Sequence, residues 1–191
     1  MLIETLIIDN FYPHVNDVRE FALSQSFDVR GNYPGLRTQP YLPRYLKDKI
    51  QYCVQNIGTI TNWYENEAST GCFQIATAKD RTWVHADHEG WAGVCYLTPN
   101  APHTSGTGLF RNKITGKRSR KELNYPDEWL KSSDYDGYDY TKWELTDILS
   151  NRYNRLVIYR ADFFHASLDY FGNNLQNGRL FQVFFFDINL N

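Results

Sequence analysis

The stretch TWVHADHEGW, residues 82–91, contains the two side chains on which the interpretation of this sequence depends. His85 and Asp87 are separated by one residue, within a segment whose β-branched and aromatic residues are typical of a strand. Residues two apart on a strand point to the same face, so this imidazole and this carboxylate would project side by side. Both groups are good ligands for transition metals, and the pair therefore predicts two ligands of a metal site. Taken alone it is a weak signal, because a His and an Asp at this spacing occur by chance in many proteins.

A third candidate ligand, His165, lies much later in the chain, in the segment RADFFHASL. Its aromatic neighbours predict a late strand, which in a β-sandwich can lie opposite the first pair. Two histidines and one carboxylate on one face form the facial triad of non-haem Fe(II) oxygenases, which leaves coordination positions open for other molecules. The alternative interpretation of His165 is a core histidine that forms a hydrogen bond with a carbonyl group.

Arg179 opens the apolar segment 179–188 and would share one strand face with Phe181, Val183 and Phe185. If that face points inward, the guanidinium is carried into an aromatic interior. A buried arginine needs an anion, because a desolvated charge without a partner is costly. An acidic side chain of the protein could supply the anion. A dicarboxylate co-substrate would supply it better, because the planar guanidinium binds a carboxylate through two parallel hydrogen bonds.

The rest of the chain predicts helices first and strands after them. Residues 2–9 are expected to form a strand, and a helix follows with Asn16 or Asp17 as its N-cap. A second helix is expected over residues 43–57, because apolar side chains recur there at helical spacing. Beyond it the segments are short, aromatic and β-branched, with turn residues between them. This order predicts an α+β, mainly β chain in which helices back a β-sandwich.

We expect residues 1–191 to form a single domain, because no linker or repeat divides the sequence. Residues 1–60 would be a helical support segment, and residues 71–188 the β-rich core. A polar, charged loop insertion at residues 112–141 interrupts that core, and a short helix is expected over about residues 140–150.

The composition argues against several classes of protein. The formal net charge is −2, which gives no electrostatic reason to expect a nucleic acid or a membrane surface as a partner. The cysteines, Cys53, Cys72 and Cys95, are odd in number and far apart, which argues against a disulfide framework or a cysteine-based zinc site. No apolar run approaches the ~20 residues that span a bilayer, and the first residues lack the basic start of a signal peptide. We therefore expect a cytoplasmic protein.

Taken together, the His85-x-Asp87 pair, His165 and Arg179 resemble the Fe(II)/2-oxoglutarate-dependent dioxygenase superfamily, and most closely its prolyl-4-hydroxylase-like branch. The resemblance covers about residues 71–188. It includes the stretches VHADHEGWAGVCYLTPN and SGTGLFRN, in which a strand ending in His-x-Asp is followed by a Tyr-Leu strand and a Gly-rich turn. The fold it implies is a double-stranded β-helix, that is, a jelly roll, with supporting N-terminal helices.

The resemblance also implies roles for individual residues. His85, Asp87 and His165 would bind Fe(II), and Arg179 with Tyr96 would bind the distal carboxylate of 2-oxoglutarate. With O₂, such an enzyme hydroxylates an unactivated C–H bond of a peptidyl, amino-acid or other small-molecule substrate and releases succinate and CO₂. Ascorbate is a further candidate cofactor.

The sequence departs from the family pattern near these residues. Many relatives carry a Tyr shortly before His-x-Asp, where this chain has Thr82 and Trp83, and some carry a Ser at the position of Phe181. Two other interpretations therefore stay open. One is a cupin-type metal enzyme that does not use 2-oxoglutarate, in which Arg179 has a structural partner. The other is a non-catalytic jelly-roll module that binds a ligand in an aromatic groove.

Overall fold

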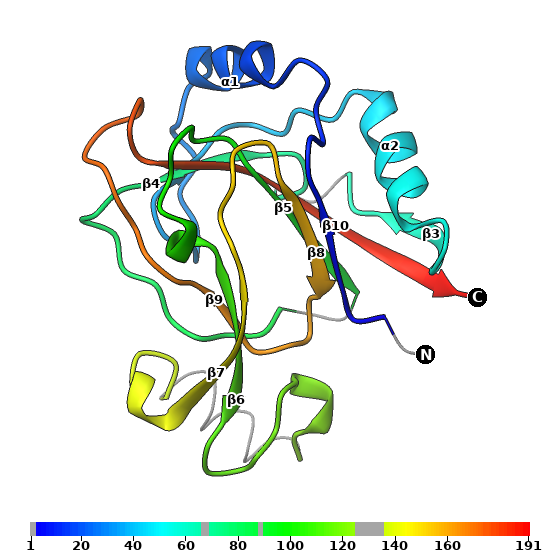
Figure 1. The fold of residues 1–191 in the computed structure, drawn as a ribbon, viewed down its shortest axis with the longest axis vertical. Helices are drawn as coiled ribbons and strands as arrows, with labels where there is room; N and C mark the ends of the chain where they lie inside the picture. Colours follow the sequence, from blue (N-terminus) through cyan, green and yellow to red (C-terminus); the bar gives the residue numbers. More distant parts are fainter. Residues whose placement is uncertain (1–2, 66–68, 88–89, 125–135) are drawn as a thin grey trace.

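The computed structural model describes residues 3–65, 69–87, 90–124 and 136–191. Within them the chain forms mostly β-strands, with two α-helices, α1 (Val15–Ser24) and α2 (Arg44–Val54), in its first third (Figure 1). Three short 3-10 turns are η1 (His103–Ser105), η2 (Arg120–Glu122) and η4 (Tyr140–Lys142). In chain order, the strands are β1 (Thr5–Ile8), β2 (Leu36–Arg37), β3 (Gly58–Trp63), β4 (Phe73–Ala76), β5 (Trp91–Tyr96), β6 (Thr107–Asn112), β7 (Trp143–Leu149), β8 (Leu156–Arg160), β9 (His165–Ser167) and β10 (Arg179–Leu190).

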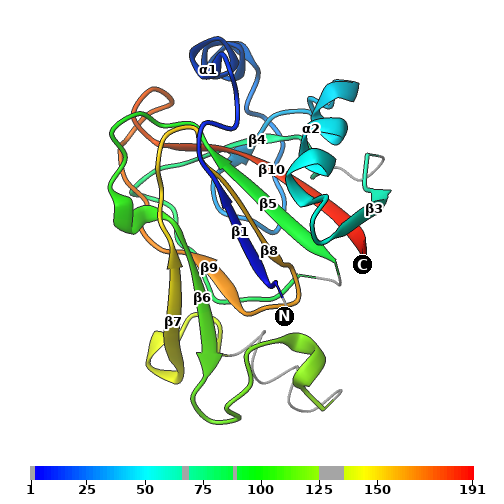
Figure 2. The same ribbon diagram turned by 45° about the vertical axis from the view of Figure 1, so that its right-hand side comes forward.

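The strands of the described residues form two antiparallel sheets. The larger sheet has seven strands, in the order β1-β8-β5-β10-β4-β2, and β3 pairs with the C-terminal part of β10. The smaller sheet has three strands, in the order β7-β6-β9. The helices lie at one end of the molecule and the β6–β7 pair extends to the other (Figure 2). The architecture is therefore mainly β with two supporting helices, as the sequence predicts.

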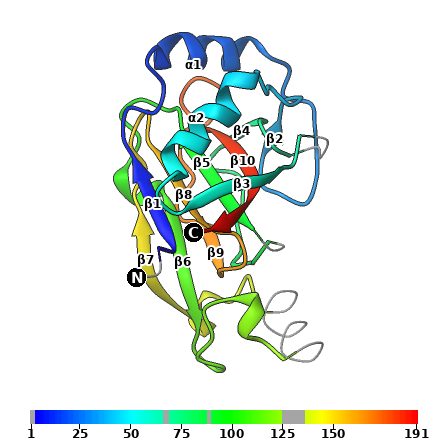
Figure 3. The same cartoon turned by 90° about the vertical axis from the view of Figure 1, so that its right-hand side faces the viewer.

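Helix α2 packs on the outer side of the larger sheet, next to β3 (Figure 3). Its side chains Leu46, Ile50 and Val54 are completely buried, which confirms the helical face predicted from their spacing. Burial of one such side chain stabilises the fold by about 1.5–3 kcal/mol. The helix thus fixes the outer side of the sheet.

Strand β10 has one face in the apolar core and one face in a cavity. Leu180, Phe184 and Phe186 belong to the same core cluster as the buried residues of α2. Successive strand residues alternate between the two faces, so the odd-numbered residues point the other way. The prediction that Arg179 shares an inward face with aromatic neighbours is confirmed. The residues of β10 that line the cavity are Arg179, Phe181, Val183 and Phe185.

Three local predictions were wrong. The segment that contains His85 and Asp87 is not a strand, because among the described residues between β4 and β5 only His85 forms a β-bridge, an isolated one with His165. The helix expected over about residues 140–150 is strand β7, which pairs with β6 along its whole length. That pairing gives β7 backbone hydrogen bonds along the side that faces β6 and overrides the local helical pattern, because tertiary contacts outweigh propensity. Helix α1 begins at Val15 after His14, and neither Asn16 nor Asp17 caps it. Asn16 instead accepts a hydrogen bond from the Tyr153 hydroxyl group, at 2.8 Å.

The expected insertion at residues 112–141 lies only partly in the described structure. Its described parts include the end of β6 and the turns η2 and η4, while residues 125–135 lie outside the described residues. Among the described helices, none is both long enough and apolar enough to cross a membrane.

Candidate metal centre

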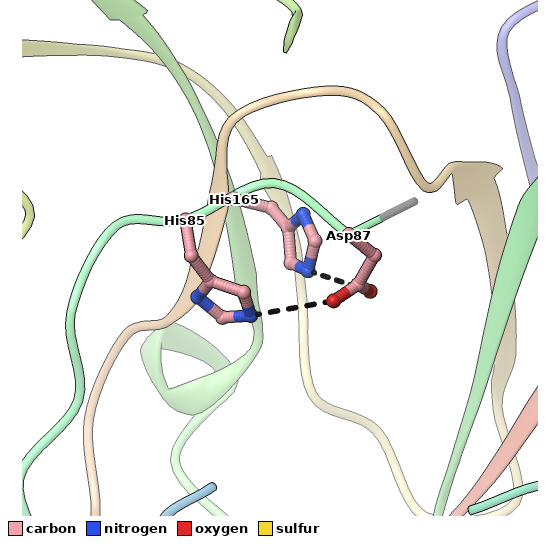
Figure 4. Close-up of side chains that lie close together, drawn as sticks. All are labelled: His85, Asp87 and His165. Atoms are coloured by element: carbon pink, nitrogen blue, oxygen red, sulfur yellow. Dashed lines mark ion pairs between the residues drawn. The ribbon is translucent and has the colours of Figure 1, made fainter. Parts of the chain in front are cut away.

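The structure brings together the three candidate metal ligands, His85, Asp87 and His165 (Figure 4). One ligand atom from each lies within 4.8 Å of the other two. The Asp87 carboxylate oxygens are 3.9 Å from His85 Nε2 and 3.5 Å from His165 Nε2. Two imidazoles and one carboxylate facing a common point form the ligand set of a non-haem iron site.

Backbone hydrogen bonds hold the two histidines side by side. The His85 amide donates to the His165 carbonyl at 3.0 Å, and the His165 amide donates to the His85 carbonyl at 2.7 Å. A third bond, from the Asp87 amide to the Ala161 carbonyl at 2.9 Å, fixes the other end of the short segment. The pairing of residues far apart in sequence therefore brings the three side chains together.

Each histidine also has its outer ring nitrogen beside a backbone carbonyl oxygen. Nδ1 of His85 lies 3.0 Å from the Trp83 oxygen, and Nδ1 of His165 lies 2.8 Å from the Phe163 oxygen. A carbonyl oxygen accepts only from N–H, so Nδ1 carries the proton in a neutral ring and Nε2 keeps its lone pair. In metalloproteins this outer hydrogen bond orients the ring and makes it a better ligand.

His165 is buried, whereas His85 and Asp87 are partly open to solvent. Burial, with a smaller contribution from neighbouring His85, lowers the pKa of His165 to about 4, while Asp87 opposes this shift. The ring is therefore neutral near pH 7, as a metal ligand must be.

The triad opens into a cavity of about 600 Å³ that lies between the two sheets. Its walls come from β4, β5, β8 and β10 of the larger sheet and from β6 and β9 of the smaller one. The aromatic and β-branched side chains of β10 form an apolar wall, and Arg179 lies in the same cavity.

Arg179 is 1 % exposed and is held by backbone and aromatic groups. Its Nε donates to the Ser105 carbonyl at 2.8 Å, and its Nη2 donates to the Gly106 carbonyl at 3.3 Å. The guanidinium also lies 4.4 Å from the centre of the Phe181 ring. The third nitrogen, Nη1, is buried and has no hydrogen-bond partner among the described residues.

The unpaired Nη1 shows that Arg179 has no anionic partner among the described residues. No acidic side chain of the described residues forms an ion pair with Arg179. Burying a guanidinium without an anion is costly, so an anionic group bound in the cavity beside Arg179 would stabilise it. A carboxylate of a bound molecule fits this requirement.

Tyr96 is not among the residues that line the cavity. It is completely buried behind Arg179, and its hydroxyl group lies 2.9 Å from Thr107 Oγ1 and donates to the Leu149 carbonyl at 3.2 Å. The hydroxyl is thus already satisfied by the protein. Tyr96 positions Arg179 and Thr107, while Thr107 itself reaches the cavity.

Sequence patterns did not identify two further cavity residues. Tyr159 of β8 has its ring 5.0 Å from the His165 ring, and its hydroxyl forms no hydrogen bond within the described part of the chain. The apolar run LVIYR was a usable signal for it, because a tyrosine inside such a run is expected to be buried and shares the strand face of Val157. Arg37 comes from the N-terminal third and also lines the cavity. Its segment reads as a Pro- and Gly-containing loop in the sequence, and only the pairing of β2 with β4 places Arg37 at the cavity.

Comparisons with known proteins show the family of this chain and its fold. The sequence model of a family described as a family of unknown function (DUF6445) matches residues 3–186. No curated protein matches the sequence. Among solved structures, HygX from Streptomyces hygroscopicus with nickel and 2-oxoglutarate bound is 12 % identical, with a TM-score of 0.63 over 97 % of this chain and 83 % of HygX.

Two further structures extend the comparison. HygX with iron bound is 11 % identical, with a TM-score of 0.56 over 97 % of this chain and 82 % of that one. A prolyl-4-hydroxylase from Pseudomonas putida is 13 % identical, with a TM-score of 0.48 over 97 % and 93 % of the two chains. The likeness in fold rests on HygX, for which it is greater. The expected double-stranded β-helix of the Fe(II)/2-oxoglutarate dioxygenases is confirmed, and the chemistry must be argued from the residues of this chain.

Proposed function

This chain belongs to the DUF6445 family, and we propose that it is an Fe(II)- and 2-oxoglutarate-dependent dioxygenase that hydroxylates a small substrate. One observation carries the proposal. The guanidinium nitrogen Nη1 of Arg179 has no hydrogen-bond partner among the described residues, and Arg179 lines the same cavity as the candidate metal ligands His85, Asp87 and His165. A dicarboxylate that also binds the metal satisfies both needs at once.

The residues present fit the implied metal. His85 and His165 would bind Fe(II) through Nε2, because their Nδ1 atoms face carbonyl groups, and Asp87 would bind it through its carboxylate. Together with 2-oxoglutarate and O₂, Fe(II) supplies the oxidising power for hydroxylation of a C–H bond, with release of succinate and CO₂.

The protein's own groups bind and orient the co-substrate. Nη1 of Arg179 donates to the distal carboxylate, while Ser105 and Gly106 keep the guanidinium from rotating. Tyr159 offers the hydroxyl group that the resemblance had assigned to Tyr96, since the Tyr159 hydroxyl is free of protein partners within the described residues. The apolar wall of β10 excludes water from the reacting atoms.

A cupin-type metal enzyme without 2-oxoglutarate is disfavoured by the same arginine. In such an enzyme Arg179 needs a structural partner, and the described residues supply only two backbone carbonyl groups and aromatic rings. A non-catalytic binding module is disfavoured by the two histidine rings, each of which presents Nε2 to the Asp87 carboxylate.

An anaerobic titration tests the proposal. Fe(II) is added to the intact protein and 2-oxoglutarate second, and the visible spectrum is recorded. We expect a metal-to-ligand charge-transfer band only when both are present, because the band requires the 2-oxo acid group on Fe(II). Glutarate is the matched control, since it has both carboxylates and lacks the 2-oxo group. It should compete for Arg179 and produce no band. Absence of a band with Fe(II) and 2-oxoglutarate would contradict the proposed function.

A further inference from the structure

The second buried arginine of the cavity, Arg37, contacts a different set of protein groups from Arg179. It is 8 % exposed and lies on β2, which is the edge strand of the larger sheet beyond β4. Its Nε donates to Gln74 Oε1 at 2.7 Å, and its Nη1 donates to Ser69 Oγ at 2.8 Å. The guanidinium carbon lies 3.7 Å from the centre of the Tyr33 ring. Three protein groups therefore hold this side chain in one position.

Those three groups orient Arg37 and leave its charge unpaired. Within the described residues it forms no ion pair with a carboxylate, and its Nη2 forms no hydrogen bond. Burial lowers the pKa of the guanidinium, and neighbouring Tyr33, Cys72 and Asp87 partly oppose that shift. The Gln74 amide, the Ser69 hydroxyl group and the Tyr33 ring carry no negative charge. The positive charge of Arg37 is therefore largely removed from water and not neutralised, at the wall of the cavity.

The sheet register separates Arg37 from the co-substrate arginine. Arg37 lies opposite Gln74 of β4, and Gln74 lies opposite Phe181 of β10. Two strand spacings place Arg37 about 10 Å to the side of Phe181, whereas Arg179 is two residues along β10 from it. Both side chains line the cavity, on strands that are not neighbours. One dicarboxylate that joins the metal to Arg179 therefore leaves Arg37 for a different anion.

The charges around the cavity point the same way. Among the lining residues that the structure describes, Arg37 and Arg179 form no ion pair with a carboxylate, and the acidic one is Asp87. Asp87 belongs to the proposed metal triad, and a metal ion would add further positive charge. A doubly negative co-substrate offsets only part of this charge, so the space beside Arg37 favours a substrate group that is negatively charged.

We propose that the substrate is a small molecule with a free carboxylate, such as an amino acid, and that Arg37 binds this carboxylate. The inference rests on the proposed dioxygenase function and names the substrate class of the same site. Nε and Nη1 of Arg37 already hold protein acceptors, so the substrate contact is made chiefly through Nη2. A singly charged carboxylate suits this single free nitrogen better than a phosphate dianion, which needs several donors. Tyr33 and Gln74 are positioning residues, because they act through Arg37.

Matched acid and amide pairs test this inference across the whole substrate class. The protein is loaded anaerobically with Fe(II) and 2-oxoglutarate and titrated with the common L-amino acids and, separately, with their carboxamides. Binding is measured from the change in the charge-transfer band and by calorimetry. We expect one or more of the acids to bind at least about 10-fold more tightly than the matching amide, because the amide loses a charge-assisted hydrogen bond. If no acid binds, or if amides bind equally well, the inference is wrong.

The variant Arg37→Gln sharpens the result. It should weaken binding of the responsive acid by about 10- to 100-fold and leave the affinity for 2-oxoglutarate unchanged. Unchanged acid binding in this variant would overturn the role of Arg37. The comparison of acids with amides in the unaltered protein decides the substrate class even if the variant does not fold. Failure of the proposed function has a different signature, which is the absence of the charge-transfer band before any amino acid is added.

Discussion

The two ends of the cavity differ in how their polar side chains are held. At the metal end, the side chains of His85 and Asp87 are 31 % and 32 % exposed and lie on a short segment between β4 and β5. At the other end, Arg179 opens a twelve-residue strand and is fixed by carbonyl groups and aromatic rings. The end with the candidate metal ligands is therefore partly open to solvent, whereas Arg179 at the other end is buried and held by the protein.

This difference predicts that a substitution at one end can weaken binding of Fe(II) or of 2-oxoglutarate without affecting the other. In the proposed function three ligands would share one ion, so the loss of any of them would weaken binding of the ion as a whole. Arg179 contacts none of the metal ligands in the described structure, so its loss affects the co-substrate alone. The expected effects on ligand binding are largest for the substitution of His165 and smallest for the substitution of Tyr96, whose hydroxyl group already has protein partners.

Substitution His165→Ala should have the largest effect, because it removes the one buried ligand of the metal triad. We expect Fe(II) affinity to fall by more than about 100-fold, since loss of even an outer hydrogen-bond partner costs 10- to 100-fold. Equilibrium dialysis with Fe(II) under anaerobic conditions measures the affinity. His14→Ala is the matched control, because His14 is exposed and far from the triad in sequence, and it should bind Fe(II) normally. Full Fe(II) binding by His165→Ala would show that the triad is not the metal site.

Substitution Arg179→Gln should weaken binding of 2-oxoglutarate and leave binding of Fe(II) unchanged. We expect the dissociation constant of 2-oxoglutarate to rise by about 100-fold, because the distal carboxylate loses a buried charge-assisted partner. Fe(II) affinity should stay as in the unaltered protein. Calorimetry of the Fe(II)-loaded variant gives both values. The control is Arg111→Gln, which removes an exposed arginine that pairs with Glu144 on the surface. A simultaneous loss of Fe(II) binding in Arg179→Gln would mean that the two ends are not independent.

Substitution Tyr159→Phe removes a hydroxyl group at the border of the two ends. We expect 2-oxoglutarate affinity to fall by about 5-fold, which corresponds to one hydrogen bond of roughly 1 kcal/mol. The ring packing against His165 is kept, so Fe(II) binding should not change. The measurement is the same titration of the charge-transfer band. An unaltered affinity for 2-oxoglutarate would place the Tyr159 hydroxyl outside the co-substrate site.

Substitution Tyr96→Phe should have the smallest effect on binding, because the Tyr96 hydroxyl is already satisfied by protein groups. We expect 2-oxoglutarate affinity to stay within about 2-fold and the free energy of unfolding to fall by about 1 kcal/mol. Denaturant unfolding and the band titration measure the two quantities. A larger loss of affinity than in Tyr159→Phe would restore the role that the resemblance assigned to Tyr96.

Much of the site was predictable because its residues are chemically unusual for their surroundings. His165 and Arg179 lie inside apolar segments, where burial of an ionisable group is costly unless the group has a partner. Strand alternation then placed Arg179 with Phe181 and Val183 on one face, and the structure agrees. These inferences needed only the chemistry of the side chains and the two-residue alternation of side chains along a strand.

The errors arose where the outcome depends on distant segments. Residues 143–149 have a local pattern compatible with a helix, but β6 offers unpaired backbone groups beside them and a strand forms. Tyr96 and Tyr159 both lie on buried strands of one sheet. Only the packing of β6 and β7 decides that the first hydroxyl is covered by the protein and the second is not.

The sequence by itself predicted a mainly β chain, named His85, Asp87 and His165 as candidate metal ligands, and placed Arg179 on one strand face with Phe181 and Val183. It did so because alternation and residue chemistry are local properties. The tertiary structure alone decided that His85 pairs with His165 through the backbone, that Nη1 of Arg179 lacks a partner, and that Arg37 shares the cavity. Each of these depends on contacts between segments remote in the chain, and such contacts are set by the packing of the whole fold.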